Sequence, residues 1–592
     1  MTPPSLTPSL RTVPLLLATL LATLLASCGG SGDSGGASSN TPYQGTLLNG
    51  TKCAVRYYAQ SQPPQSAGTD PLYLTQWYLK NTGRLTGYSG LAAGEDLRVE
   101  NVWASGLRGE NIRVAVVDDA LEVTHQDLAP NVVEGASYNY VSDGSWQRGS
   151  PWPLPCTSSQ THGTAVGGVV AARDSNGLGG RGVAPRASLV GYNALANDLD
   201  SEVLDALVRD QGKNHIYNNS WGAEDDGHFN APWSRSAQVG TILNGLRNGR
   251  NGLGSIYTFA GGNGGANGDY SALDGNVSML GAIPVCGTNA AGKRAPYSEP
   301  GPNLIVCAPS SDMGQENGSS LPDVTTTTLQ NQYTAKFNGT SAATPMISGV
   351  VALMLQANPN LTWRDVPLVL ARSARQVDPT NAGWTSYGGY HYNHEYGFGV
   401  ADATAAVQLA RSWQSVGGSS TLRQCGPYSA TVNQAIPETT PVSDALLQNP
   451  FADASGLNKA AVNGVTSRIS AAGCGIQHIE HVDVVLTATD DTGARAHPSA
   501  GDLQITLTSP NGQTSTLTTP HLCYNTSGQR TNYTSGQRTN CQGLVDFSFG
   551  ISRHLEEPAI SGTSSDWTLA AADRRTGNTG RLRNWSITLY GR

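Results

Sequence analysis

One serine of this chain has the sequence context of a nucleophile. Residues 338–345 (NGTSAATP) place Ser341 after Gly339 and ahead of the apolar, helix-like run 346–355, which predicts a serine at the start of a helix. A serine hydroxyl is a weak nucleophile until a neighbouring base takes its proton. Ser341 is therefore informative only if the chain also supplies a base, an orienting carboxylate and a donor for the oxyanion.

Three further segments place suitable side chains at the ends of predicted elements. The apolar run 112–117 predicts a buried strand, and Asp118 follows it directly. His162 begins a run of small residues that predicts a helix. Asn263 lies in a glycine-rich turn after a second apolar run, 254–259. We expect these positions to meet at one edge of a sheet.

The four side chains together predict a hydrolytic site. We expect Ser341 to attack a carbonyl, His162 to act as general base and then acid, and Asp118 to orient the imidazole. The Asn263 amide and the Ser341 N–H would form the oxyanion hole. Taken singly, such segments are more often helix caps or turns. Their combination, each at an element end, favours catalysis.

These segments resemble the subtilisin-like serine proteases, and within them the kexin/furin-like branch. The resemblance covers about residues 70–410 and resumes in a second domain. It rests on residues 70–72, 76–83, 116–119, 162–164, 220–227, 262–265, 297–299, 339–341, 361–366 and 396–399. It implies a doubly wound, mostly parallel α/β sheet, with the site at the carboxyl ends of the strands. An all-β jelly-roll P-domain is expected to follow.

Acidic residues crowd the segments of the expected site. The resemblance implies that Asp225 and Asp274 line the first specificity pocket and that Asp119 faces the preceding substrate residue. Glu224 is a further candidate for substrate binding. Carboxylates in a pocket favour a cationic side chain, because charge pairing offsets its desolvation. We therefore expect an endopeptidase that cleaves protein substrates after Arg or Lys.

Two departures from the furin-like pattern leave alternatives open. The acidic residues that the branch carries near Ser159 and Ala231 are absent, which predicts a looser cleft. A broad-specificity subtilisin-like protease is thus the alternative within the enzymes. A catalytically silent surface adhesin is the alternative from another class, and the presence of all four chemical residues disfavours it.

The resemblance also implies two calcium sites. The first comprises Asp70, Asp127, the Asn176 side chain and the carbonyls of Arg173, Leu178 and Gly180; the second comprises Asp225, Asp269 and Glu299. Calcium takes six to eight oxygen ligands, which such a set supplies. The alternative for these residues is an ordinary set of acidic and amide side chains in surface turns.

The N-terminus has the pattern of a targeting segment. Arg11 precedes the apolar run 13–26, which is short for a membrane span. The run ends before Cys28 and is similar to the bacterial lipoprotein signal, in which this cysteine is lipidated. We expect a lipid-anchored protein outside the cytoplasm, with the outer membrane favoured because no Asp follows Cys28. Ordinary secretion is the alternative.

Composition, together with the extent of the resemblance, predicts four regions: a signal peptide (1–27), a tether (28–69), a catalytic domain (70–415) and a β-sandwich (425–592). Alternating runs such as 479–486 and 502–508 predict the strands of the sandwich. The net charge of −8 argues against nucleic acid as a partner. Only about 41 residues separate Cys28 from Asp70, and many of them are linker, which is marginal for an independent hydrophobic core, so we expect no conventional folding pro-segment. The protein would fold unaided or with a separate chaperone.

The cysteines indicate an oxidising compartment. Nine are present, and setting Cys28 aside leaves an even number. Eight cysteines allow 105 connectivities. Closeness in hairpin-rich sequence favours Cys286–Cys307 and Cys523–Cys541, while Cys425–Cys474 and Cys53–Cys156 complete the set that we expect.

Overall fold

The computed structural model describes most of the chain from Gly68 onward. The described residues are 68–142, 148–197, 199–230, 235–312, 318–443, 463–493, 495–525, 537–539, 541 and 543–592. The predicted signal peptide, Cys28, Cys53, nearly all of the tether and Ala231 lie outside them. The predictions made for those residues stay predictions.

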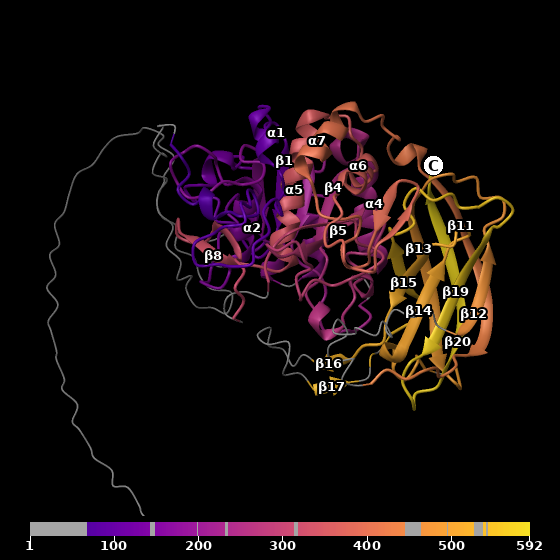
Figure 1. Ribbon diagram of the computed structural model, residues 1–592. Coiled ribbons are helices and arrows are strands. Elements are labelled where there is room, and N and C mark those ends of the chain that lie inside the picture. The colour runs from indigo at the N-terminus through magenta and orange to yellow at the C-terminus, as the bar shows by residue number, and fades with distance from the viewer. Residues whose placement is uncertain are drawn as a thin grey trace, which may run out of the picture. The chain divides into compact units, whose positions relative to one another are not determined.

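A six-stranded parallel sheet forms the centre of the catalytic domain (Figure 1). Its strands are β1 (Arg113–Val117), β2 (Ser188–Tyr192), β3 (Ile216–Asn219), β4 (Ile256–Ala260), β5 (Ala282–Thr288) and β6 (Val306–Pro309), in the order β2-β1-β3-β4-β5-β6. Parallel sheets are covered on both faces, so their strands are apolar almost throughout. This property makes β1 and β4 predictable from the runs 112–117 and 254–259. The parallel sheet and its strand order confirm the expected doubly wound fold.

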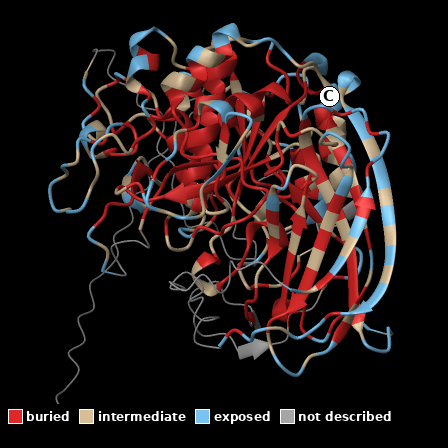
Figure 2. Cartoon of the chain, turned by 45° about the vertical axis from the view of Figure 1, so that its right-hand side comes forward, coloured by how far each residue is buried: buried red, intermediate tan, exposed pale blue. Residues whose placement is uncertain are grey.

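The catalytic domain contains seven α-helices among its described residues. They are α1 (Glu100–Ala104), α2 (His162–Ala171), α3 (Asp200–Ala206), α4 (Arg235–Asn248), α5 (Thr340–Ala357), α6 (Asp365–Ser373) and α7 (Ala403–Ser412). By length and composition, helix α5 could cross a membrane, but 83% of its residues are buried inside the protein. It is therefore a core helix, as its contacts with the sheet strands and its burial in Figure 2 show.

Two short antiparallel pairs supplement the central sheet. They are β7 (Val324–Thr327) with β8 (Tyr333–Phe337), and β9 (Thr385–Tyr387) with β10 (Tyr390–Tyr392). The β7–β8 pair contacts α2 through Thr326 and Thr327, whose hydroxyls donate to the Ala165 and Thr164 carbonyls at 2.8 and 2.7 Å. The chain then runs from β8 directly into α5, which brings this hairpin next to the candidate site.

The C-terminal domain consists mainly of two four-stranded antiparallel sheets. Its strands are β11 (Arg423–Ala435), β12 (Val465–Ser470), β13 (Ile479–Asp490), β14 (Leu503–Thr508), β15 (Thr514–Thr518), β16 (Cys523–Asn525), β17 (Gln537–Thr539), β18 (Phe547–Ile551), β19 (Asp566–Asp573) and β20 (Gly580–Gly591). The sheet orders are β11-β20-β13-β18 and β12-β19-β14-β15. Inward-facing residues of both sheets form one buried cluster. Strand β11 has no buried residue and is the exposed edge seen in Figure 2.

Disulfides connect the expected cysteines within each domain. Cys286–Cys307, Cys425–Cys474 and Cys523–Cys541 are bonded. Cys156 is also in a disulfide, and its expected partner lies outside the described residues. The hairpin expected for the first pair was wrong. Cys286 and Cys307 are register partners on the parallel strands β5 and β6, which are joined by a crossover.

A buried ion pair fixes the junction between the two domains. The Arg364 guanidinium donates to both carboxylate oxygens of Glu480, at 2.7 and 2.6 Å. Their side chains are 0% and 7% exposed. Arg364 also donates to the Gly418 carbonyl at 3.1 Å. Because a planar guanidinium binds a carboxylate in two places, this contact fixes orientation as well as distance.

Candidate active site

The structure brings Asp118 and His162 into contact at the carboxyl edge of the sheet. Asp118 follows β1, and His162 is the first residue of α2. His162 Nδ1 lies 2.8 and 3.0 Å from the two carboxylate oxygens of Asp118. Asp118 is 2% exposed, whereas the His162 side chain is 35% exposed. The pair thus has a buried acid that orients a reachable imidazole. The Phe337 ring, at 5.5 Å and 73° to the imidazole, packs against it.

Asp119 contacts the start of α2. Its carboxylate accepts the Gly163 N–H at 2.9 Å and the His162 N–H at 3.4 Å. Burial, together with the neighbouring Asp118 charge, raises the pKa of Asp119. These contacts hold the first turn of α2, and with it His162, against the end of β1. The role that the sequence predicted for Asp119, facing a substrate residue, stays a prediction.

Ser341 lies in the first turn of α5. The helix begins at Thr340, and Gly339 before it has a φ of 79°, which favours glycine. Ser341 Oγ donates to the Ser220 carbonyl at 3.0 Å, and Ser220 Oγ donates to the Ser341 carbonyl at the same distance. The first N–H groups of a helix have no intrahelical acceptor. The Ser341 N–H is therefore available to an oxyanion.

The side-chain amide of Asn263 is oriented by the residue before Ser341. Asn263 Oδ1 accepts the Thr340 N–H at 2.7 Å and the Thr340 hydroxyl at 2.9 Å. Because the carbonyl end is held this way, the Nδ2 end is the one that can donate to an oxyanion. Thr340 was not predicted from the sequence. The only sequence feature that could indicate its role is a hydroxyl side chain directly before the nucleophile. Hydroxyl residues are too common for this position alone to predict a function.

The predicted pocket acids lie on two neighbouring loops. Asp274 accepts the Ala223 and Asn276 N–H groups, both at 2.7 Å, and burial raises its pKa to about 6. Asp225 accepts the Asn263 N–H at 2.8 Å, which connects the pocket to the oxyanion residue. Glu224 is exposed.

The first predicted calcium set comes together around the loop 173–180. Asn176 Nδ2 donates to Asp127 Oδ1 at 2.7 Å, and the Asn176 N–H donates to Asp70 Oδ1 at 3.3 Å. Asp127 is fully buried, and its Oδ2 lacks a hydrogen-bond partner among the described residues. Burial raises the pKa of Asp127 to about 7, and the Asp70 charge adds to the rise. Arg181, 2.6 Å from Asp70 Oδ2, partly offsets this charge.

The second set holds three acids close to the pocket. Asn263, Gly227 and Gly264 donate their N–H groups to Asp225, Asp269 and Glu299, at 2.8, 2.9 and 2.8 Å. Burial raises the pKa of each acid, and neighbouring carboxylates raise those of Asp269 and Glu299 further. Several carboxylates packed together at neutral pH call for a cation, so both sets fit the oxygen chemistry of calcium.

A second serine–histidine–carboxylate arrangement in the C-terminal domain has no access to substrate. His554 lies 3.0 Å from Ser515 Oγ through Nε2 and 3.0 Å from Glu557 Oε1 through Nδ1. All three residues are 0% exposed. No peptide can reach this serine in the folded protein, and we assign the group to the packing of the domain.

Comparison with known proteins gives the same two domains. Residues 109–399 match the model of the subtilase family, and residues 480–589 match that of the proprotein convertase P-domain. A dibasic-processing endoprotease of Schizosaccharomyces pombe is 31% identical over 88% of this chain and 65% of its own length. The endoprotease bli of Onchocerca volvulus is 31% identical over 94% of this chain and 72% of its own.

A solved bacterial structure is similar over nearly the whole chain. The serine protease of Aeromonas sobria has a TM-score of 0.71 and 26% identity, and covers 92% of this chain and 100% of its own. It has also been solved in complex with a chaperone. The chain spans between half and two thirds of the first curated relatives it matches, 52% to 65% of their lengths. On this evidence the chain belongs to the subtilase family, in the kexin/furin-like branch that carries a P-domain.

Proposed function

We propose that this protein is a serine endopeptidase that hydrolyses peptide bonds on the carboxyl side of Arg or Lys. The Asp118–His162 contact carries the proposal, because an imidazole held by a buried carboxylate is prepared to take a proton. His162 also packs on Phe337, only four residues before Ser341 along the chain. The same site region supplies the Asn263 amide.

Each group then has a defined step. Ser341 Oγ gives its proton to His162 Nε2 and attacks the scissile carbonyl, so its hydrogen bond to the Ser220 carbonyl breaks. Asp118 stabilises the resulting imidazolium. Asn263 Nδ2 and the Ser341 N–H bind the oxyanion. His162 next protonates the leaving amine, and water, deprotonated by His162, releases the acyl group from Ser341.

The acidic loops support the preference for basic side chains. Asp274 and Asp225 would present carboxylates to a basic side chain, and the S. pombe relative carries the name of a dibasic-processing enzyme. Burial disfavours the negative charge of these carboxylates, and the positive charge of an Arg or Lys side chain in the pocket would offset that cost.

Calcium is proposed as a structural ion at two places. Asp70, Asp127, Asn176 and the carbonyls of Arg173, Leu178 and Gly180 would hold one ion. Asp225, Asp269 and Glu299 would hold the other. In each case the ion would neutralise buried carboxylates and fix the loops that carry them.

We further propose a location outside the cytoplasm, with the protein anchored by a lipid on Cys28, the outer membrane being favoured. The disulfides support an oxidising compartment. A separate folding chaperone remains part of the proposal, and the A. sobria protease, solved with a chaperone, supports it.

Cleavage-site profiling tests the proposal directly. A peptide library digested by the wild-type protein should show Arg or Lys before the cut, and a calcium chelator should reduce the activity. A fluorophosphonate should label the wild type but not Ser341→Ala. Continued cleavage by Ser341→Ala would refute the mechanism, whereas cleavage without basic enrichment would favour a broad-specificity subtilase.

A further inference from the structure

The two loops that carry the pocket acids are packed into the core of the P-domain. Phe229, Tyr270 and Leu273 belong to the same buried cluster as the strands of that domain. The Phe229 ring lies 5.5 Å from that of Phe547 on β18, at an interplanar angle of 87°. The pocket loops therefore have their apolar anchor in a different domain from the catalytic sheet.

Gly227 connects these loops to the P-domain through polar contacts. Its N–H donates to Asp269 Oδ2 at 2.9 Å. Its carbonyl oxygen lies 2.8 Å from His521 Nε2 and 2.9 Å from Cys523 Sγ. Gly227 has a φ of 81°, and a Cβ there would lie 2.6 Å from the Leu522 carbonyl. The peptide is thus held between an acid of the pocket region and one turn of the P-domain.

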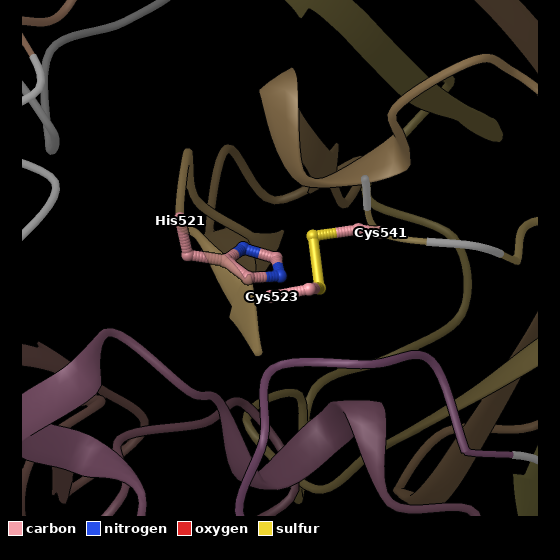
Figure 3. Close-up of side chains that lie close together, drawn as sticks. All are labelled: His521, Cys523 and Cys541. Carbon is pink, nitrogen blue, oxygen red and sulfur yellow. A yellow bond between two sulfur atoms is a disulfide. The ribbon is translucent and has the colours of Figure 1, made fainter. Parts of the chain in front are cut away.

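The His521 imidazole lies beside the Cys523–Cys541 disulfide (Figure 3), and both contact the Gly227 carbonyl. A nitrogen of His521 and both sulfurs lie within 4.8 Å of one another, which resembles a metal-binding group. The sulfurs are bonded to each other, however, so neither is a thiolate that could bind a metal. The other ring nitrogen of His521 lies 2.6 Å from the Thr519 carbonyl. Burial lowers the pKa of His521, and a neutral imidazole has a single N–H, so one of the two carbonyl contacts is a hydrogen bond and the other is a packing contact.

We infer that His521, supported by the Cys523–Cys541 disulfide, is a positioning residue for the specificity pocket. It holds the Gly227 peptide, whose N–H orients Asp269, next to Asp225. The P-domain would then contribute to the choice of substrate as well as to stability. This inference rests on the proposed preference for Arg or Lys.

The test compares two peptide substrates that differ only in Arg or Leu before the scissile bond. The readout is the ratio of their kcat/KM values in the full chain. His521→Leu removes the contact to Gly227 and should lower the Arg-to-Leu ratio about two- to twelve-fold, as the loss of one hydrogen bond would. His521→Gln keeps a nitrogen donor and should retain most of the ratio. A merely unfolded fraction lowers both kcat/KM values equally and leaves the ratio unchanged.

The other P-domain disulfide provides a matched control. The Cys523→Ser/Cys541→Ser variant should lower the ratio, whereas Cys425→Ser/Cys474→Ser should not. The sequence separations are 18 and 49 residues, so chain entropy alone predicts the larger loss of stability for the control.

Each outcome is decisive. A ratio unchanged in His521→Leu, with a clear basic preference in the wild type, would overturn the inference alone, whatever the Cys523/Cys541 variant does. Equal losses in the two disulfide variants would do the same. A wild-type ratio near one would overturn the proposed specificity, and the inference with it.

Discussion

Replacing Asn263 isolates the oxyanion contribution to catalysis. Asn263→Asp keeps the Oδ1 that accepts the Thr340 N–H at 2.7 Å and the Thr340 hydroxyl at 2.9 Å. It exchanges only the Nδ2 donor for a second carboxylate oxygen. Loss of one such donor costs about 2.7–4 kcal/mol, or roughly 100- to 1000-fold in kcat. The carboxylate also repels the oxyanion, so we expect the loss to reach the upper end of this range.

Thr340→Val is the matched control. It removes the hydroxyl contact to Asn263 and the longer hydroxyl contacts to Gly262 at 3.3 and 3.4 Å, but leaves the main-chain contact and the Nδ2 donor. One neutral hydrogen bond contributes about 1 kcal/mol, which limits the expected loss to about five-fold. Both variants should retain the wild-type KM, because the oxyanion exists only beyond the ground state.

Steady-state kinetics on an Arg peptide, corrected by fluorophosphonate titration of active sites, gives the two kcat values. The reasoning fails if Asn263→Asp keeps more than about a tenth of kcat, a loss below about 1.4 kcal/mol. It also fails if Thr340→Val loses as much kcat as Asn263→Asp. The contact that holds the Asn263 side chain would then matter more than the Nδ2 donor itself.

Three further predictions concern the pocket, the domain junction and calcium. Burial raises the pKa of Asp274 to about 6, so its stabilising contribution is present at low pH and is lost as pH rises through 6. Asp274→Asn should therefore raise Tm at pH 8 relative to wild type but not at pH 4, while lowering the Arg preference; a pH-independent change would contradict this. Arg364→Met breaks the buried pair with Glu480 and should cost about 3–5 kcal/mol in denaturant unfolding. Arg592→Met removes more exposed pairs with Glu480 and Glu556 and should cost less than about 2 kcal/mol; equal losses would refute the assignment. Added calcium should raise Tm, and Asp127→Asn should remove much of that rise; an unchanged rise would exclude this residue as a ligand.

Much of the catalytic edge could be predicted because it follows local rules. Strands buried on both faces are continuous apolar runs, and the polar residues that follow them lie at the same edge of a parallel sheet. Asp118 and Asn263 were found this way. Ser341, predicted at the start of a helix, lies in the first turn of α5, which begins at Thr340.

Elements with one exposed face were harder to predict. Strand β11 was missed although Tyr428, Ala430 and Val432 alternate with polar residues and pack against the core of the P-domain. The alternation covers only this short part of a 13-residue strand in which no residue is buried. The β7–β8 pair was missed because its residues are mostly Thr and polar side chains, whose partners lie on α2. Cys286 and Cys307 were paired correctly for an incorrect reason, because closeness in sequence does not distinguish a hairpin from neighbouring parallel strands.

The sequence by itself determined the chemistry, which needs a nucleophile, a base, an acid and an amide. Each of them lies at the end of a helix or strand that can be predicted from its own short run of residues. The tertiary structure decided how these groups are held. Thr340 orients Asn263, Asp119 holds the start of α2, and the P-domain contacts Gly227 through His521. These contacts join residues that are far apart along the chain, and only the packing of separate elements and domains creates them.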